Sequence, residues 1–423
     1  MTTGIIQLVS NTETASSFLI GNPQITFFKS LYKQYSNFYI TNIEQNINGK
    51  PDFDKTINCT IEKSGDLLKT IYLEITLPDL NKPANASWYG YTNNIACNLI
   101  KSVTFKINDQ VIDKIYGESI DIYNHMNNLN VNNMVLQYNS DYSIRNTSDS
   151  IHITKRQVYL QLPFWFSRNS GLALPLIALN NSSITMDIEF RKLNEVVQMD
   201  TYSNVNNITV KSNEELDFKI FTECIFLDPN EKKFFSTKSH EYLIEQLQFN
   251  GNDTITKFDT RKNTYVNFRH PVKELFWVIS PDNENIDSGL KNDYNNYTKY
   301  TTYYSNYLDT FDTLTIKLNS MVLLEDKKAA YFRLLQSKLY YNNTRNKYIY
   351  SYSFSLNPTQ YQPSGALNFS ELNDALFEFK FKNNNNNTII DTGCSTNGVI
   401  KIYANNYNIL KIASGQGSLL WVI

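Results

Sequence analysis

The sequence predicts a mainly β protein with two sandwiches in tandem, and three observations support this prediction. Several segments alternate apolar and polar residues with a period of two, which is typical of a strand with one buried face. The 423-residue chain contains 29 Tyr and 25 Phe, which favour strands, and many Asn, which favour turns. The same order of strands, hairpin and helix also occurs twice along the chain.

The alternating segments are spread over the whole chain. Each places apolar residues on one side and polar residues on the other, as expected for half-buried strands of antiparallel sheets. The apolar residues are Ile71, Leu73, Ile75 and Leu77; Val103, Phe105 and Ile107; Ile184, Met186, Ile188 and Phe190; Leu216, Phe218 and Ile220; Leu314, Ile316 and Leu318; and Phe377, Phe379 and Phe381. Helical patterns are few, and we expect short helices over Glu118 to Met126 and Lys327 to Lys338.

The repeat is clearest in a hairpin and the helix that follows it. Val103 and Val111 correspond to Leu314 and Val322, because 314 − 103 and 322 − 111 both equal 211. Later strands match at a spacing of about 190 residues, in the same order. Two copies of about 200 residues predict two tandem eight-stranded antiparallel jelly-roll β-sandwiches with a few short helices.

The repeat also suggests a domain organisation. We expect an N-terminal arm over residues 1–20, a first jelly roll over residues 21–207 and a second over residues 208–423. Long Asn- and Tyr-rich connections at 127–150 and 283–307, with a tight loop at 383–387, are expected to form one outer face.

Composition excludes several classes of function. The net charge is −2 and only 19% of residues are charged, which argues against direct binding of nucleic acid. No apolar run approaches the roughly 20 residues that cross a bilayer, and the N-terminus lacks the pattern of a signal peptide. The cysteines lie far apart, which fits reduced thiols in a cytosolic setting; they are Cys59, Cys97, Cys224 and Cys394.

The sequence offers no convincing reactive site. His240-Glu241 begins like a zinc-protease helix, but Ile244 stands where the second ligand would be. The four His residues are dispersed, which disfavours a metal cluster or a catalytic triad. The simplest role for three tryptophans is to anchor the cores; they are Trp88, Trp165 and Trp277. We therefore predict no catalytic residues, no metal ligands and no cofactor, and we do not expect an enzyme.

Ordered sequence blocks, spread from Gly21 to Gly417 over nearly the whole chain, carry a resemblance to a known family. The main blocks are Gly21-Asn-Pro-Gln-Ile-Thr-Phe-Phe-Lys29, Tyr72-Leu-Glu-Ile-Thr-Leu-Pro78, Pro163-Phe-Trp-Phe166, Gly171-Leu-Ala-Leu-Pro-Leu-Ile-Ala-Leu179, Phe226-Leu-Asp228 and His270-Pro-Val-Lys-Glu-Leu275. In this order they resemble the major capsid proteins of nucleocytoplasmic large DNA viruses. That family has a double jelly-roll fold, in agreement with the repeat found here.

The resemblance implies a structural role in a virion. It implies homotrimers in which two sandwiches per chain form pseudo-hexameric capsomers that tile an icosahedral outer shell. The implied partners are further copies of the chain, neighbouring capsomers, minor capsid and penton proteins and an internal viral membrane, with synthesis and assembly in the host cytoplasm. Two alternatives stay open: a paralogous minor capsid or assembly-scaffold protein, and a carbohydrate-binding or hydrolytic β-sandwich protein.

Overall fold

The computed structural model describes most of the chain, as two compact units, Met1–Asn37 and Phe38–Ile423. The described residues are 3–10, 18–81, 89–92, 94–127, 155–199, 207–256, 258–282, 292, 294, 297, 309–341, 348–381 and 397–421. The first unit contains helix α1 (Thr3–Ser10). Among the described residues, no helix is both long and apolar enough to span a membrane.

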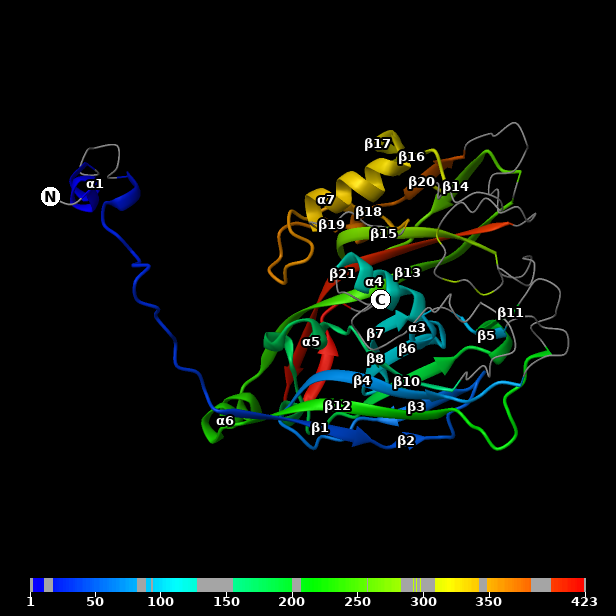
Figure 1. Ribbon diagram of the computed structural model, residues 1–423, viewed down its shortest axis with the longest axis horizontal. Helices are drawn as coiled ribbons and strands as arrows, with labels where there is room; N and C mark the ends of the chain where they lie inside the picture. The colour runs from blue at the N-terminus through cyan, green and yellow to red at the C-terminus, as the bar shows by residue number, and fades with distance from the viewer. Residues whose placement is uncertain are drawn as a thin grey trace. The chain divides into compact units, whose positions relative to one another are not determined.

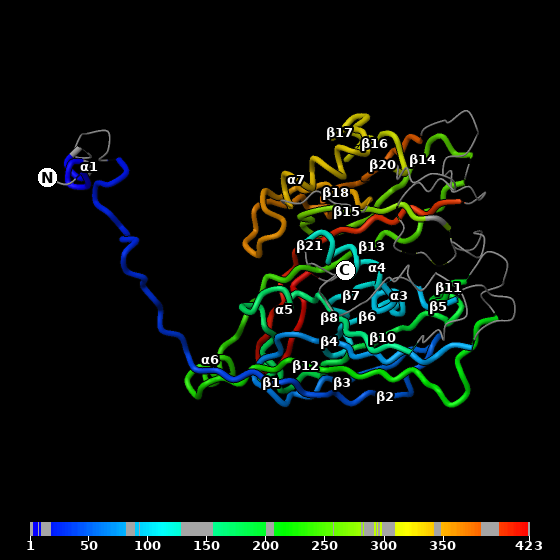
Figure 2. The backbone as a smooth tube through the Cα atoms, viewed as in Figure 1, coloured from blue at the N-terminus to red at the C-terminus, as the bar shows by residue number. Residues whose placement is uncertain are grey.

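The first sandwich of the larger unit consists of two antiparallel sheets (Figures 1 and 2). In order across the first sheet the strands are β1 (Phe38–Gln45), β12 (Asp217–Leu227), β4 (Leu67–Leu77) and β8 (Arg156–Gln161), with β9 (Leu174–Pro175) also paired to β4. The second sheet contains β2 (Ile47–Asn48), β3 (Thr56–Thr60), β10 (Ile184–Phe190), β6 (Ile100–Ile107) and β7 (Gln110–Tyr116). A separate pair joins β5 (Tyr89–Tyr91) to β11 (Val197–Met199).

The second sandwich repeats this arrangement. Its first sheet contains β13 (His240–Ile255), β21 (Gly398–Ala413), β15 (Pro271–Pro281) and β18 (Tyr350–Ser353), with β19 (Leu367–Asn368) on β15 and β22 (Gln416–Leu419) on β21. Its second sheet contains β14 (Arg261–Tyr265), β20 (Ala375–Lys380), β16 (Thr313–Leu318) and β17 (Met321–Lys328). Four strands of each sheet correspond between the sandwiches: β1, β12, β4 and β8 match β13, β21, β15 and β18, and β3, β10, β6 and β7 match β14, β20, β16 and β17. These eight strands per sandwich form the jelly roll expected from the sequence.

The predicted buried faces are confirmed. The alternating residues of β4, β6 and β10 are buried in one apolar core, together with the aromatic residues Phe164, Trp165 and Phe166. Leu314 and Ile316 of β16 and the alternating residues of β20 are buried in a second core with Trp277, and Leu318 is half-buried against that core. The period-two pattern follows from strand geometry, because successive side chains point to opposite faces of a sheet.

Short helices connect the strands. They include α3 (Ile95–Asn98), α4 (Gly117–Met126), α5 (Trp165–Arg168), α6 (Pro229–Thr237), the π-helix η8 (Tyr331–Leu335) and α7 (Gln336–Tyr341), with single 3-10 turns η3 (Ser170–Leu172), η4 (Leu176–Ala178), η5 (Leu193–Glu195) and η9 (Phe369–Glu371). The helix expected at Glu118 to Met126 is confirmed as α4. The one expected from Lys327 begins two residues later, because Lys327 and Lys328 still pair with β16 in the sheet.

The duplication extends to backbone register. Phe105 lies opposite Met186 between β6 and β10, and Ile316 lies opposite Phe377 between β16 and β20. These pairs have the spacings of the sequence repeat, since 316 − 105 is 211 and 377 − 186 is 191. The two halves therefore share strand order and also the residue-by-residue alignment of neighbouring strands.

Strand pairing places the end of the first sandwich later than the sequence analysis did. β12 follows the expected boundary at residues 207 and 208, yet it lies between β1 and β4 in the first sandwich (Figure 1). The first sandwich therefore continues to Leu227. At the other end, the first compact unit extends to Asn37, beyond the arm expected over residues 1–20.

Candidate functional site: the junction of the sandwiches and its exposed counterpart

The two sandwiches meet along β7 of the first and β13 of the second. The side-chain amide of Gln246 on β13 donates a hydrogen bond to the backbone carbonyl of Ile112 on β7. The backbone N–H of Leu247 donates to Oδ1 of Asp113 at 3.2 Å. Gln246, Ile112 and Asp113 are all buried. The second sandwich thus covers an outer strand whose unpaired edge would otherwise be exposed.

Helix α4 is buried in the same contact. Its residues Ile122 and Met126 belong to the apolar core of the second sandwich. Near the start of the helix, the carboxylate of Glu118 contacts Nζ of Lys401 on β21 at 2.7 Å, with both side chains largely buried. Gly117 begins the helix so close to the preceding backbone that a Cβ would lie 2.0 Å from the carbonyl oxygen of Cys97. We call β7, α4 and the parts of β13 and β21 that cover them the junction.

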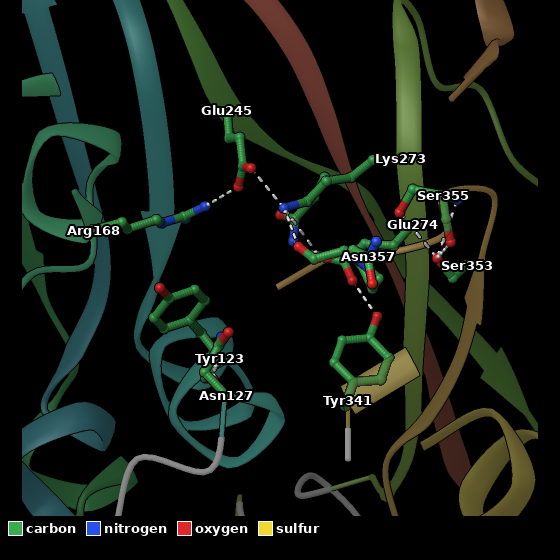
Figure 3. A network of polar contacts seen from close by, with 12 residues as sticks. Tyr123, Asn127, Arg168, Glu245, Lys273, Glu274, Tyr341, Ser353, Ser355 and Asn357 are labelled. Atoms are coloured by element: carbon green, nitrogen blue, oxygen red, sulfur yellow. Dashed lines mark hydrogen bonds and ion pairs between the residues drawn. The ribbon is translucent and has the colours of Figure 1, made fainter. Parts of the chain in front are cut away.

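A network of buried charges joins the two sandwiches beside the junction (Figure 3). Arg168 of α5 donates to Oε2 of Glu245 on β13 at 2.8 Å, and Nζ of Lys273 on β15 contacts Oε1 of the same carboxylate at 2.6 Å. The Arg168 guanidinium also lies 4.6 Å from the ring centre of Tyr123 on α4. Burial raises the pKa of Glu245, but Lys273 and Arg168 outweigh it and hold that pKa below its usual value.

The same network borders a cavity of about 230 Å³. On one side the carboxylate of Glu274 accepts hydrogen bonds from the hydroxyl of Tyr341 and from Nδ2 of Asn405. Lys273 also donates to the carbonyl of Pro358 at 2.8 Å. Two buried cations therefore face two buried carboxylates, and all four have hydrogen-bond partners. This pairing makes the network a structural link between the sandwiches.

The C-terminal hairpin, formed by β21 and β22, makes a third contact between the two sandwiches. The hydroxyl of Ser182 and the backbone N–H of Asn181 both donate to the carbonyl of Gly415, at 3.1 and 3.0 Å. Gly415 has a φ of +82°, and a Cβ there would lie 2.1 Å from Oδ1 of Asn180. Leu419 of the same hairpin is buried in the core of the first sandwich. The turn between β21 and β22 therefore requires glycine so that the hairpin can reach the first sandwich.

The second sandwich contains counterparts of β7 and α4, the elements of the first sandwich that lie in the junction. These counterparts are exposed. β17 corresponds to β7, and η8 with α7 corresponds to α4. Leu323 is 39% exposed, whereas its counterpart Ile112, 211 residues earlier, is 1% exposed. We call the exposed apolar residues of these packed elements the β17–α7 surface; they are Met321, Val322, Leu323, Leu334, Leu335 and Leu339.

Comparison with known proteins identifies the family. Residues 26–228 match the family model "Major capsid protein N-terminus", and residues 231–418 match "Large eukaryotic DNA virus major capsid protein". The chain is 30% identical to the major capsid protein of Pyramimonas orientalis virus, over 99% of each chain. It is 31% identical to that of Paramecium bursaria Chlorella virus 1, over 100% of each. The chain belongs to the major capsid protein family of large eukaryotic DNA viruses.

Solved structures show the same relationship. The capsid protein in a quasi-atomic model of the PBCV-1 virus capsid has a TM-score of 0.74 and 28% identity, and the match covers 94% of this chain and 100% of that one. The Faustovirus major capsid protein, at 14% identity and a TM-score of 0.67, shares the fold. The resemblance seen in the sequence blocks is thus confirmed, and the chain is a structural protein of the virion shell from a family that is not enzymatic.

The residues considered for chemistry have ordinary structural places in this capsid protein. The His240 ring contacts the carbonyl of Phe235, and Ile244 is buried in the first core. Over the described ranges, no three His, Cys, Asp or Glu side chains gather as a metal site would need. Trp165 and Trp277 are core residues, as expected, and Cys59, Cys97 and Cys224 are buried. Some expectations lie outside the described residues: Trp88, Cys394, the loops at 128–150 and 383–387, and nearly all of 283–307.

The charges beside the junction were not predicted from the sequence. Arg168, Glu245 and Lys273 are far apart in the chain, and no motif links them. One signal was available, however. His270-Pro-Val-Lys-Glu-Leu275 was among the blocks that resemble the family, and it contains two adjacent charges on a strand that is otherwise apolar. Charged residues are rarely buried unless they are paired, so such a strand indicates a partner elsewhere.

Proposed function

We propose that the chain forms homotrimeric, pseudo-hexameric capsomers that tile the icosahedral outer shell of a large DNA virus. The single observation that carries this proposal is the contrast between β7, which β13 covers, and β17, which is exposed along most of its length. The intrachain junction is repeated when the β17–α7 surface of one chain packs against the first sandwich of the next chain. Three such contacts close a ring of six sandwiches around a threefold axis.

The chemistry of the β17–α7 surface supports an obligate contact. It presents large apolar side chains on two adjoining elements, which is typical of an interface and unfavourable in a free monomer. Its counterpart, α4, supplies apolar residues to the next sandwich within the chain. Obligate interfaces of this kind commonly bury about 2,000–5,000 Å².

The test is the oligomeric state of a charged variant. We expect the unaltered 49.1 kDa chain to form a trimer at low micromolar concentration in multi-angle light scattering. Leu339→Asp should yield monomers, because the carboxylate would be desolvated in the interface without a partner. Phe258→Asp is the matched control, since Phe258 is exposed but lies outside the β17–α7 surface.

Each outcome has a defined meaning. A trimeric control and a folded, monomeric Leu339→Asp variant support the proposal. An unaltered chain that stays monomeric would refute the trimer, and a trimeric Leu339→Asp variant would refute the assigned interface. Circular dichroism distinguishes loss of the contact from loss of the fold.

We further propose the partners and location that such a tile requires. Copies in adjacent capsomers, minor capsid and penton proteins and an internal viral membrane would contact it, without direct binding of nucleic acid, after assembly in the host cytoplasm. A paralogous minor capsid or scaffold role is the second candidate, because one relative at 27% identity is named "Probable capsid protein 4". Quantitative mass spectrometry of virions separates the two, since the principal tile must be the most abundant shell protein.

A further inference from the structure

Two similar short segments precede the first strand of each sandwich. Asn22-Pro-Gln-Ile-Thr-Phe-Phe28 comes before β1, and Asp228-Pro-Asn-Glu-Lys-Lys-Phe-Phe235 comes before β13. Both begin with Asn or Asp followed by Pro, and both end with two Phe. The chain is thus duplicated in the segment ahead of each sandwich as well as within the sandwiches.

The strands that follow these segments are structural counterparts. Oε1 of Gln45 at the end of β1 accepts from the backbone N–H of Glu62 at 2.8 Å. Oδ1 of Asn250 on β13 accepts from the N–H of Asn267 at 3.1 Å. Both members of the second pair follow those of the first by 205 residues, since 250 − 45 and 267 − 62 are equal. The strands that follow the two segments are therefore equivalent, and the Phe-Phe pairs precede them at distances that differ by two residues, since 234 − 27 is 207.

The second copy of the segment is packed on the first sandwich. Asp228 caps helix α6 by accepting from the N–H groups of Asn230 and Glu231, at 3.0 and 2.8 Å. Lys232 pairs with the carboxylate of Asp66 at 2.9 Å. The ring of Phe235 packs on a small apolar cluster, whose buried members are Leu67, Ala173 and Ile225.

Within its own compact unit, the first copy of the segment leaves both aromatic rings uncovered: Phe27 is 89% exposed and Phe28 is 99% exposed. Of their counterparts, Phe234 is 47% exposed and Phe235 packs on the apolar cluster beside α6. Two adjacent, fully exposed aromatic rings are unfavourable in water. Their sequence and position resemble those of a segment that docks on a sandwich, so the equivalent surface of the second sandwich is a candidate docking site.

Backbone register identifies that surface on the second sandwich. In the first sandwich Leu68 lies opposite Cys224, and a bulge follows at Lys69. In the second sandwich Val272 lies opposite Asn406, and a bulge follows at Lys273. The residue before the strand also matches. In the first sandwich the backbone N–H of Ile177 donates to the carbonyl oxygen of Asp66 at 3.2 Å. In the second sandwich the backbone N–H of Phe369 donates to the carbonyl oxygen of His270 at 3.0 Å. His270 is therefore the counterpart of Asp66.

The surroundings of His270 combine a buried polar atom that lacks a partner in the described part of the chain with apolar side chains that are partly exposed. Its Nε2 is buried without a hydrogen-bond partner among the described residues, and its ring stacks on Trp421 at 6.1 Å between centres. Leu420 is 54% exposed next to it, and Ile409 is half-buried. Asp66, in the same position on the first sandwich, is already paired with Lys232.

We propose that the Asn22–Phe28 segment of each chain docks on the second sandwich of a neighbouring copy, around His270, with Phe28 in the place that Phe235 takes on the first sandwich. The proposal rests on the trimer proposed above. β13 covers β7, and the segment before it packs on that same sandwich. By equivalence, β1 covers β17 of the next chain, and the segment before β1 packs on that chain's second sandwich. Each arm would then link two chains around the ring.

A site-specific photo-crosslinker tests the proposal in the full-length protein. p-Benzoylphenylalanine is placed at Phe27, and in a second protein at its counterpart Phe234 as the matched control. After irradiation, the Phe234 probe should give products within one chain, mapped to the first sandwich around α6. The Phe27 probe should give a covalent dimer in a denaturing gel, with peptides mapped to residues 268–272, 369–371 or 405–421 of the other chain.

Light scattering of the same samples separates this proposal from the trimer itself. A trimeric sample whose Phe27 probe reacts within its own chain, with another region of the neighbour, or not at all would overturn the docking and leave the trimer standing. A monomeric sample would overturn both. An interchain product at the named peptides supports both. Phe28→Asp gives an independent measurement, because we expect it to raise the concentration for half-dissociation of the trimer at least tenfold.

Discussion

Glu245 lies between two cations that belong to different sandwiches. Arg168 reaches it from the first sandwich and Lys273 from the second, at 2.8 and 2.6 Å. Burying three charges is costly, and their mutual attraction offsets that cost only while all three are present. The triad therefore adds little net stability compared with apolar packing, but it penalises any arrangement of the sandwiches that separates the charges.

Removal of the shared carboxylate should be strongly destabilising. Glu245→Gln removes the carboxylate that pairs with Arg168 and leaves Lys273 with only Glu274, 3.9 Å away, so we expect a loss of about 3 kcal/mol in the free energy of unfolding. Chemical denaturation at pH 7 measures it. Glu241→Gln on the same strand is the control, because Glu241 pairs with Lys411 at the surface, and its loss should be below about 1 kcal/mol. Equal effects of the two changes would show that the buried triad has no special role.

Asp113 gives the junction a dependence on pH. Burial is the main cause that raises the pKa of its carboxyl from 3.8 to about 6, despite Arg168 and the N–H of Leu247, which lower it. The pKa of Asp113 is higher in the folded chain than in the unfolded chain. The contribution of its protonated carboxyl to stability is therefore fully present below pH 4 and is lost as the pH rises through about 6. The full change is on the order of 2–3 kcal/mol.

The variant Asp113→Asn should therefore be more stable than the unaltered chain at pH 8 and similar to it at pH 4. The amide keeps the acceptor for Leu247 but never ionises, so the loss of stability between those pH values should shrink. Thermal unfolding across the range measures the difference. Asp109→Asn on the same hairpin is the control, since Asp109 is exposed. If the variant and the unaltered chain follow the same pH profile, Asp113 does not titrate in this range.

At the scale of elements, the duplicated hairpins share one turn design. Asn108 and Asp109 have φ angles of +50° and +64°, and Asn319 and Ser320 have +48° and +62°. Such angles suit two-residue turns whose twist matches the strands. Each first Asn also accepts from the start of the neighbouring strand, at the N–H of Ser183 or of Asn373, at 2.9 and 2.7 Å. The Asn side chain thus ties each hairpin to the next strand.

Replacement of Asn108 or of Asn319 should lower the free energy of unfolding by about the same amount. Asn108→Ala and Asn319→Ala each combine an unfavourable positive φ with a lost hydrogen bond, so we expect about 1–2 kcal/mol from each. Asn→Gly at the same positions removes the hydrogen bond alone and should cost less. Equilibrium denaturation of the four variants measures these differences. A clear effect in only one half would contradict the equivalence of the two turns.

The sequence was sufficient to predict the sandwiches because strands in both halves, such as β4 and β10 in the first and β16 in the second, alternate apolar and polar residues. Two boundaries were misplaced for physical reasons. Lys327 and Lys328 suit an exposed helix as well as an exposed edge strand, and only pairing with β16 decides between them. The end of the first sandwich was placed at a polar stretch, but β12 returns after it to fill the space between β1 and β4. Such long-range pairing leaves no local pattern in the chain.

At the scale of the whole molecule, the junction could not be predicted from the sequence. Ile122 and Met126 read as ordinary apolar residues of a short helix, and only the structure shows that they belong to the core of the other sandwich. The β17–α7 surface has the same ambiguity, because exposed and buried leucines look alike in a sequence. Comparison of the two halves distinguishes the copies: one copy of the edge is covered within the chain, and a neighbouring chain would cover the other in the proposed trimer.

The two edges that would meet in the proposed capsomer are chemically different, so each added subunit presents a fresh copy of the surface that it used to attach. Such head-to-tail growth stops only when the rotation at each step returns the last subunit to the first; otherwise it continues as an open fibre. The angle fixed by Glu245 and α4 within one polypeptide therefore also sets the copy number of the ring. Substitutions that loosen this angle would turn closed particles into filaments before they unfold the protein.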